Sequence, residues 1–168
     1  MVGDRGGEKE VVLRKNPFIP PMLPTLKKEP PRGSMWTHEV KFDGFRIQIH
    51  KDGGDVALYS RNGHNFTSRY PGLARAFAKR CSTRACILDA ELTAIDSDGH
   101  PDFGALLIPR LESDVCVWVF DILSLRGQDL RPLPFVTRRY KLDRKRCTAP
   151  TFRASPGCGL MPGHGRSI

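Results

Sequence analysis

The stretch EVKFDGFRIQIHKDGGDVALYS, residues 39–60, decides how the chain folds. Apolar and polar side chains alternate along it, which is typical of a half-buried β-strand, and we predict a strand over residues 39–51. The two faces of that strand would carry Phe45, Ile47 and Ile49 on one side and Arg46, Gln48 and His50 on the other. Asp52-Gly53-Gly54-Asp55 is a turn sequence, and residues 56–60 supply a partner strand. The stretch therefore predicts an antiparallel hairpin.

Further segments add helices and strands to this hairpin. Residues 71–80 place Leu73, Ala76 and Phe77 at helical spacing behind a proline, which predicts an amphipathic helix. Residues 115–120 are the most hydrophobic run and predict a strand buried on both faces, ending at Asp121. The remaining predictions are a polar loop over 61–68, a strand over 86–95, a turn over 96–99, and helices over 103–111 and 136–146, the last with Tyr140 as an apolar anchor. The predicted fold class is α+β, with mainly antiparallel sheets and flanking helices.

Composition places these elements in one folded domain with extended ends. A chain of 168 residues with 39% hydrophobic residues is long enough for one core, which excludes wholesale disorder. Six prolines before Ser34 predict an extended lead-in over residues 1–34, where we expect no function to begin. The tail, residues 147–168, is rich in Gly and Pro and is expected not to pack. The predicted folded domain is residues 35–146.

Charge and cysteine content narrow the expected partners. The 27 Lys and Arg residues exceed the 18 Asp and Glu residues, and the formal net charge of +9 favours a polyanion such as nucleic acid or nucleotide. Because no apolar stretch is long enough for a membrane span and the first ten residues lack the apolar core of a signal peptide, we expect a cytoplasmic protein. The five cysteines lack zinc-site spacing, and we expect reduced thiols.

A lysine flanked by acidic residues stands at the start of the predicted hairpin. On a strand, Glu39, Lys41 and Asp43 would share one face, and Gly44 would allow a backbone departure that a Cβ hinders. Such a lysine is a candidate nucleophile. Physical reasoning alone favours the alternative, a surface strand with a solvated Glu-Lys pair.

The pattern Glu39-x-Lys41-x-Asp43-Gly44-x-Arg46 resembles the signature motif of the ATP-dependent DNA ligases, which belong to the covalent nucleotidyltransferase superfamily. Further segments resemble the successive motifs of that family in the same order. They are Trp36, Ser60-Arg61-Asn62-Gly63, Asp89-Ala90-Glu91-Leu92, Phe120-Asp121-Ile122-Leu123, and Leu133-Pro134 with Arg138-Arg139 and Leu142. The resemblance runs from about Pro21 to about Arg146 and is strongest to bacterial ligases of end joining and repair.

The resemblance implies that Lys41 attacks the α-phosphate of ATP and keeps AMP on its Nζ as a phosphoramidate. AMP would then pass to the 5′-phosphate of a DNA nick, and the 3′-hydroxyl would displace it to seal the strand. A free lysine is only about one part in a thousand deprotonated near neutral pH, so we expect the site to lower the pKa of Lys41. Arg46 and a bound Mg²⁺ would supply the cationic field, and Mg²⁺ would also neutralise the pyrophosphate leaving group.

The same resemblance implies roles for the remaining site residues. Glu39 would contact adenine, Arg46 the ribose or phosphate, Glu91 the ribose hydroxyls or the metal, and Phe120 would stack on adenine. Without the resemblance, Phe120 would be assigned to the core. Ser60 and Arg61 would contact the 5′-phosphate or the DNA backbone, because a forked guanidinium suits phosphate oxygens. The basic helix with Arg138 and Arg139 would add salt-sensitive DNA affinity.

Other family features are absent from the sequence. The Glu-Gly pair of the fourth motif, the Lys-x-Lys of the fifth and the second, OB-type domain are missing, and resemblance stops near Arg146. We therefore expect a C-terminally truncated or frameshifted ligase gene whose product is weak or inactive. The expected partner is nicked or broken double-stranded DNA, with repair proteins as further partners, and we expect a monomer. Two alternatives stay open: a noncatalytic nucleic-acid-binding remnant, and an RNA ligase or guanylyltransferase relative.

Overall fold

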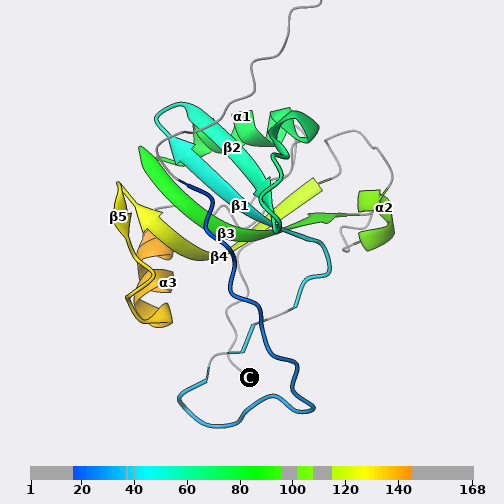
Figure 1. The fold of residues 1–168 in the computed structure, drawn as a ribbon, viewed down its shortest axis with the longest axis vertical. Coiled ribbons are helices and arrows are strands. Elements are labelled where there is room, and N and C mark those ends of the chain that lie inside the picture. Colours follow the sequence, from blue (N-terminus) through cyan, green and yellow to red (C-terminus); the bar gives the residue numbers. More distant parts are fainter. Residues whose placement is uncertain (1–16, 37, 40, 96–101, 108–114, 145–168) are drawn as a thin grey trace, which may run out of the picture.

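The computed structural model describes residues 17–36, 38–39, 41–95, 102–107 and 115–144. In this part of the chain, five strands form one antiparallel sheet with the order β2-β1-β3-β4-β5 (Figure 1). Their bounds are β1 Phe45–Asp52, β2 Asp55–Ser60, β3 Ala85–Ala94, β4 Val115–Leu125 and β5 Gln128–Asp129. The helices are α1 Pro71–Arg80, α2 Phe103–Leu107 and α3 Phe135–Arg144, with a 3-10 turn, η1, at Thr67–Arg69. The predicted α+β class is confirmed.

The predicted hairpin is present, and β1 and β2 pair with Asp52 opposite Asp55. Gly53 has a positive φ of 61°, which a tight two-residue hairpin turn requires and glycine adopts without strain. β1 begins at Phe45, however, and not at residue 39. Its other neighbour is β3, which places β1 in the interior of the sheet.

Helix α1 covers one face of the sheet and has the predicted bounds. Its buried side chains Leu73 and Phe77 join Ile47, Ile49 and Leu58 in the main apolar cluster. The alternating apolar residues of β1 and the helically spaced apolar residues of α1 therefore pack against each other in the same core.

The other face of β1 is also covered, which differs from the half-buried strand that was predicted. Gln48 and His50 are buried although their positions alternate with the apolar ones. The chain from residue 17, blue in Figure 1, passes over this face. Residues 17–24, called the N-terminal strap below, therefore contact the sheet instead of preceding it.

The structure corrects two further predictions. β4 continues past Asp121 to Leu125. Val115, Cys116 and Val117 are buried, as expected for a strand covered on both faces, but Trp118, Val119 and Phe120 are only partly buried. Tyr140 is 60% exposed, and Leu142 is the buried anchor of α3, because the face of α3 that meets the sheet includes position 142.

Other predictions agree with the structure or cannot be compared with it. Residues 86–95 were predicted as a strand and correspond to β3, and the start of the predicted helix over 103–111 corresponds to α2. Cys81, Cys86 and Cys116 are buried thiols. Among the described helices, none has the length and apolar character to cross a membrane. The predicted turn at 96–99, the ends of two predicted helices (108–111 and 145–146) and the tail 147–168 lie outside the described residues.

Candidate active site

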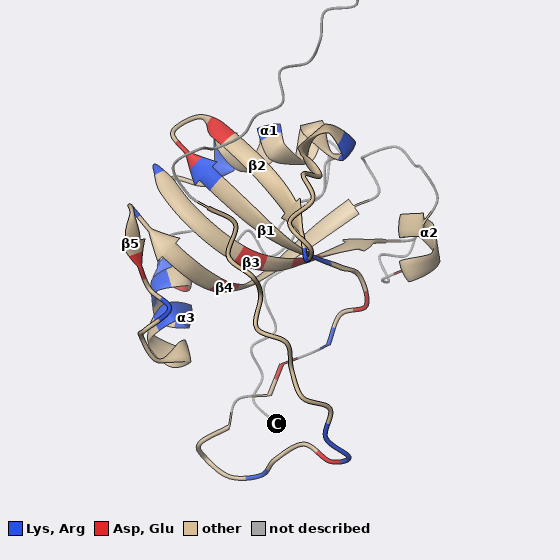
Figure 2. Cartoon of the chain, viewed as in Figure 1, with Lys and Arg blue, Asp and Glu red and all other residues tan. Residues whose placement is uncertain are grey.

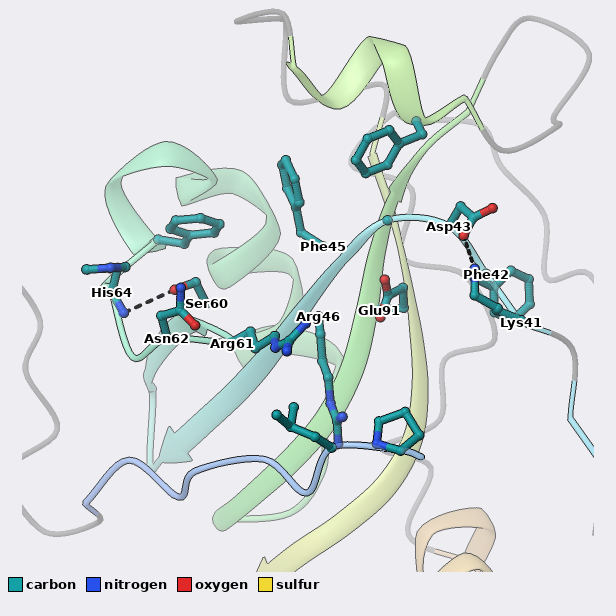
Figure 3. A pocket seen from close by; sticks show the side chains of 15 residues that line it. Lys41, Phe42, Asp43, Phe45, Arg46, Ser60, Arg61, Asn62, His64 and Glu91 are labelled. Carbon is teal, nitrogen blue, oxygen red and sulfur yellow. Dashed lines mark hydrogen bonds and ion pairs between the residues drawn. The ribbon is translucent and has the colours of Figure 1, made fainter. Parts of the chain in front are cut away.

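An open pocket of about 820 Å³ lies where β1 and β3 meet the loops before β1 and after β2 (Figure 3). This volume is within the range of ordinary small-molecule sites. In Figure 3, Lys41 and Asp43 stand on one side, the loop with Ser60 and His64 on the other, and Glu91 between them. The further lining residues are Leu23, Pro24, Phe42, Gly44, Phe45, Arg46, Arg61, Asn62, Phe66 and Phe103.

Gly44 sets the position of the loop that carries Lys41. A Cβ built on Gly44 would lie 2.2 Å from the backbone oxygen of Leu92, so only glycine allows the chain to pass this close to β3. The Gly44 N–H donates a hydrogen bond to the Glu91 carboxylate. Residues 39 and 41–43 lie outside the sheet, so the prediction that the strand begins at residue 39 is wrong.

Lys41 lies at the pocket with its amine in solvent. Its side chain is 82% exposed and forms an ion pair and hydrogen bond with Asp43. Asp43 raises the pKa of Lys41, and the charge of Glu91 adds to the same direction. This is opposite to the lowered pKa that was expected, because a carboxylate lies next to the amine while the guanidinium of Arg46 is engaged elsewhere.

Arg46 is held on three sides. Its Nε and Nη2 donate to the two oxygens of Asp89 at 3.1 and 2.7 Å, and its Nη1 donates to the Met22 oxygen at 2.8 Å. The guanidinium also lies over the Phe120 ring, 5.6 Å from its centroid. The hydrogen bond to Asp89 raises the pKa of Arg46. Arg46 lines the pocket, and two of its guanidinium nitrogens are bound to the carboxylate of Asp89.

Glu91 projects from β3 opposite Arg46 in the sheet register. Partial burial raises the pKa of this carboxyl group, and the Gly44 hydrogen bond and the charge of Arg46 oppose the shift. The charge of Lys41 also lowers the pKa of Glu91, as the charge of Arg46 does. The structure therefore brings together at one pocket Lys41, Arg46 and Glu91, three residues to which the resemblance gives roles in the site.

Two predicted nucleotide contacts, Glu39 and Phe120, are not among the residues that line the pocket. Glu39 forms an ion pair of 3.4 Å with Arg139, and Arg139 also donates to the Phe120 backbone oxygen at 2.9 Å. These contacts join the loop that carries Lys41 to α3.

An aromatic stack next to Lys41 was missed by the sequence analysis. The rings of Phe42 and Trp118 are nearly parallel, with centroids 4.1 Å apart, and the Trp118 indole N–H donates to Thr93 Oγ1 at 2.9 Å. Phe42, the aromatic residue between Lys41 and Asp43, is visible in the sequence. Its stacking partner could not be identified there, because Trp118 lies 76 positions later, on β4.

The four predicted DNA contacts lie in different environments. Ser60 and Arg61 border the pocket in a tight loop, in which the His64 backbone N–H donates to Ser60 Oγ at 3.1 Å. Arg61 is exposed. Arg138, by contrast, donates hydrogen bonds from Nε and Nη2 to the two carboxylate oxygens of Asp121, at 2.8 and 2.7 Å, and its side chain is only 15% exposed. Arg138 is therefore a partly buried structural partner of Asp121, and the Arg139 side chain is more exposed, at 34%.

Asp89, which binds Arg46, and Asp121, which binds Arg138, are paired positions on the neighbouring strands β3 and β4. Like charges at such positions repel, and each is compensated by an arginine from a different element. Figure 2 shows acidic residues on β3 and basic residues on α3. The described residues contain no cluster of three His, Cys, Asp or Glu side chains that would hold a metal ion alone.

Comparison with known proteins identifies the class to which this fold and pocket belong. The chain is a member of the ATP dependent DNA ligase domain family, whose model matches residues 21–151. It is similar to the multifunctional non-homologous end joining protein LigD of Pseudomonas aeruginosa, with 38% identity over 129 residues. That match covers 75% of this chain and 15% of the relative. DNA ligase 2 of Methanosarcina acetivorans is 36% identical over 116 residues, covering 62% of this chain and 20% of that protein.

Solved structures give the same family. A mycobacterial DNA ligase D complexed with ATP and MES matches with a TM-score of 0.58 and 35% identity, over 63% of this chain and 35% of that one. The ligase domain of Mycobacterium tuberculosis LigD matches with the same TM-score and 36% identity, and with the same coverage of both chains. The predicted family and fold are confirmed, and the chain spans about a third or less of these relatives.

Proposed function

We propose that this chain carries the ATP-reacting pocket of a DNA ligase. Lys41 Nζ attacks the α-phosphorus of ATP, a P–N bond forms, and the bond to the β-phosphate oxygen breaks to release pyrophosphate. AMP then passes to the 5′-phosphate at a DNA nick, where the 3′-hydroxyl displaces it. The observation that carries the proposal is the meeting of Lys41, Arg46 and Glu91 in one pocket of a chain from this family.

The attack requires the lone pair of a neutral amine. In the described structure Lys41 is hydrogen-bonded to Asp43, which favours the charged form. Reaction therefore requires that the amine lose a proton and move from Asp43 towards the α-phosphate of the bound nucleotide. The exposure of Lys41 leaves its side chain free to make that movement.

Magnesium fits the residues of this pocket. Mg²⁺ is commonly held by one or two carboxylates together with phosphate oxygens, and Glu91 is a carboxylate in the pocket with an aqueous opening. Bound with ATP, Mg²⁺ would neutralise charge on the triphosphate and on the pyrophosphate leaving group. Glu91 would hold it, and the raised pKa of Glu91 would return toward its ordinary value beside a cation.

Nicked or broken double-stranded DNA is the proposed second substrate. Ser60 and Arg61 border the pocket and would contact the 5′-phosphate, and partly exposed Arg139 would contact the backbone. Arg138 is not included in this set, because it does not line the pocket and its guanidinium is bound to Asp121. The net charge of +9 supports salt-dependent attraction to DNA.

Covalent labelling tests the proposal. The protein is incubated for long periods with Mg²⁺ and α-labelled ATP, denatured, and examined for label retained at Lys41 by peptide mass spectrometry. We expect label in the unaltered protein and in Lys27→Ala, and none in Lys41→Ala or Lys41→Arg. Label in Lys41→Ala would show that another group is the nucleophile. Label from GTP instead of ATP would indicate a guanylyltransferase relative, and DNA binding without label a noncatalytic protein.

A further inference from the structure

At Ile19, the N-terminal strap is attached to the sheet by a side chain, Gln48, which takes the place of a strand backbone. Gln48 is 2% exposed, and its amide accepts a hydrogen bond from the Ile19 N–H at 3.3 Å and donates one to the Ile19 oxygen. A side-chain amide has one acceptor and a donor group, so it can satisfy both backbone groups of one residue. The strap therefore docks at Ile19 as a paired edge strand would.

The strap reaches both the binding group and the rim of the pocket. The Met22 oxygen takes the Nη1 donor of Arg46, which is the nucleotide-binding candidate on β1. Leu23 and Pro24 follow directly and line the pocket. At its other end, the Phe18 ring lies against Gly63, where a Cβ would be 3.2 Å from it, and 6.2 Å from the Tyr59 ring. The strap thus connects Arg46 with the loop that carries Ser60 and Arg61.

We propose that the strap is one wall of the nucleotide pocket and that Gln48 is the positioning residue that holds this wall. The inference deepens the proposed function and rests on it. Leu23 and Pro24 offer apolar surface, which suits the base or ribose of a nucleotide better than its phosphates. Leu23 is 58% exposed although it is apolar, and a nucleotide in the pocket would cover part of this surface.

The position of the strap predicts which kinetic quantity it controls. Among the described residues, the Gln48 side chain bonds to the strap while the Lys41 amine bonds to Asp43, so the loss of Gln48 or Leu23 should change the binding of the nucleotide rather than the reaction of the amine. A wall that is released must be ordered again when the nucleotide binds, which weakens affinity without altering the bound geometry. The expected signature is a change in ATP affinity at an unchanged saturated rate.

The test compares ATP dissociation constants, measured by equilibrium dialysis, with labelling rates at saturating ATP. Gln48→Leu removes both hydrogen bonds to Ile19, and we expect about tenfold weaker ATP binding with a saturated rate within about twofold. Gln128→Leu is the matched control, since Gln128 is exposed on β5, and it should change neither quantity. Hydrogen exchange of the peptide that contains residues 17–24 should accelerate in Gln48→Leu alone.

A second variant covers the case in which Gln48→Leu does not fold. Leu23→Ala leaves the docking at Ile19 intact and should weaken ATP binding about threefold. Unchanged affinity in both variants, or a lower saturated rate at unchanged affinity, would overturn the role of the strap. If the unaltered protein binds ATP without becoming labelled, the proposed reaction is wrong. The role of the strap is then still tested by the ATP dissociation constants of the variants. If it does not bind ATP at all, both proposals fail.

Discussion

The two ends of the segment Lys41–Arg46 are held in opposite ways. The Arg46 guanidinium donates hydrogen bonds to the Asp89 carboxylate and to the Met22 oxygen, and it lies over the Phe120 ring. The Asp89 side chain is only 5% exposed. Lys41, five residues earlier, projects into solvent and is bonded to Asp43, which is itself 73% exposed. The proposed binding group is therefore fixed before any ligand arrives, whereas the proposed reacting group still has to move. Preorganisation on the binding side reduces the ordering cost of capturing a nucleotide.

The largest expected effect comes from breaking the fixed side. Asp89→Asn removes the charge that compensates Arg46 in a mostly buried pair, and we expect the free energy of unfolding to fall by about 2–5 kcal/mol. Urea denaturation measures it. Asp129→Asn is the matched control, because the Arg131–Asp129 pair has the same fork but is about half exposed, and little change is expected there. Equal losses in the two variants would contradict the comparison.

The next effect concerns the junction between the two sides. Gly44→Ala places a Cβ against the Leu92 oxygen, which the β3 backbone can relieve only by shifting, and we expect a loss of about 1–3 kcal/mol in stability. Labelling at Lys41 should fall as well, because the loop before Gly44 would move. Gly54→Ala is the control, since no atom lies within 4 Å of its added Cβ. A Gly44→Ala protein as stable as Gly54→Ala would show that the close approach to β3 is not required.

The mobile side can be tested through pH. Asp43 raises the pKa of Lys41, so the neutral amine becomes abundant only at higher pH. Asp43→Asn should lower that pKa toward its ordinary value, and acylation of Lys41 at neutral pH should become severalfold faster. Competitive acetylation with mass spectrometry measures this at each lysine, with exposed Lys27 as the internal reference. A pH profile that does not move would mean that Asp43 does not hold the amine in solution.

The smallest effect is expected at Glu91, between the two sides. Burial raises the pKa of this carboxyl group in the folded protein, so ionising it above that pKa weakens the fold. Glu91→Gln keeps an acceptor for the Gly44 N–H and should melt slightly higher than the unaltered protein at neutral pH. The difference should vanish in acid, below the unfolded pKa, where Glu91 is neutral in both states. Melting curves across pH measure it, and a lower melting temperature at neutral pH would show that the charge stabilises the fold.

Local sequence patterns predicted much of the fold. The alternation before the Gly53-Gly54 turn gave the hairpin, and the spacing of Leu73 and Phe77 gave α1 with its bounds. These signals work because both elements bury one periodic face against the same core. The resemblance placed Lys41, Arg46 and Glu91 in one site, where the structure also brings them together.

Contacts between distant segments were not predictable in this way. Nothing in the proline-rich lead-in indicates that Ile19 will pair with Gln48, because the pairing uses backbone groups that every residue has. Arg138 looked like a DNA contact because its buried partner, Asp121, lies on another element. The predicted strand starts too early, at residue 39 instead of Phe45, because alternation cannot reveal that Gly44 must pass beside the Leu92 oxygen.

The stack of Phe42 on Trp118 gives the protein an optical reporter at the residue next to Lys41. The chain has two tryptophans, and the other, Trp36, is 57% exposed, so Trp36→Phe would leave Trp118 as the single indole fluorophore. Any movement of Lys41 out of its pair with Asp43 that shifts the neighbouring ring would then change the emission of Trp118. Rapid-mixing fluorescence could follow the approach of the amine to a nucleotide in real time, without a label and before any bond is made.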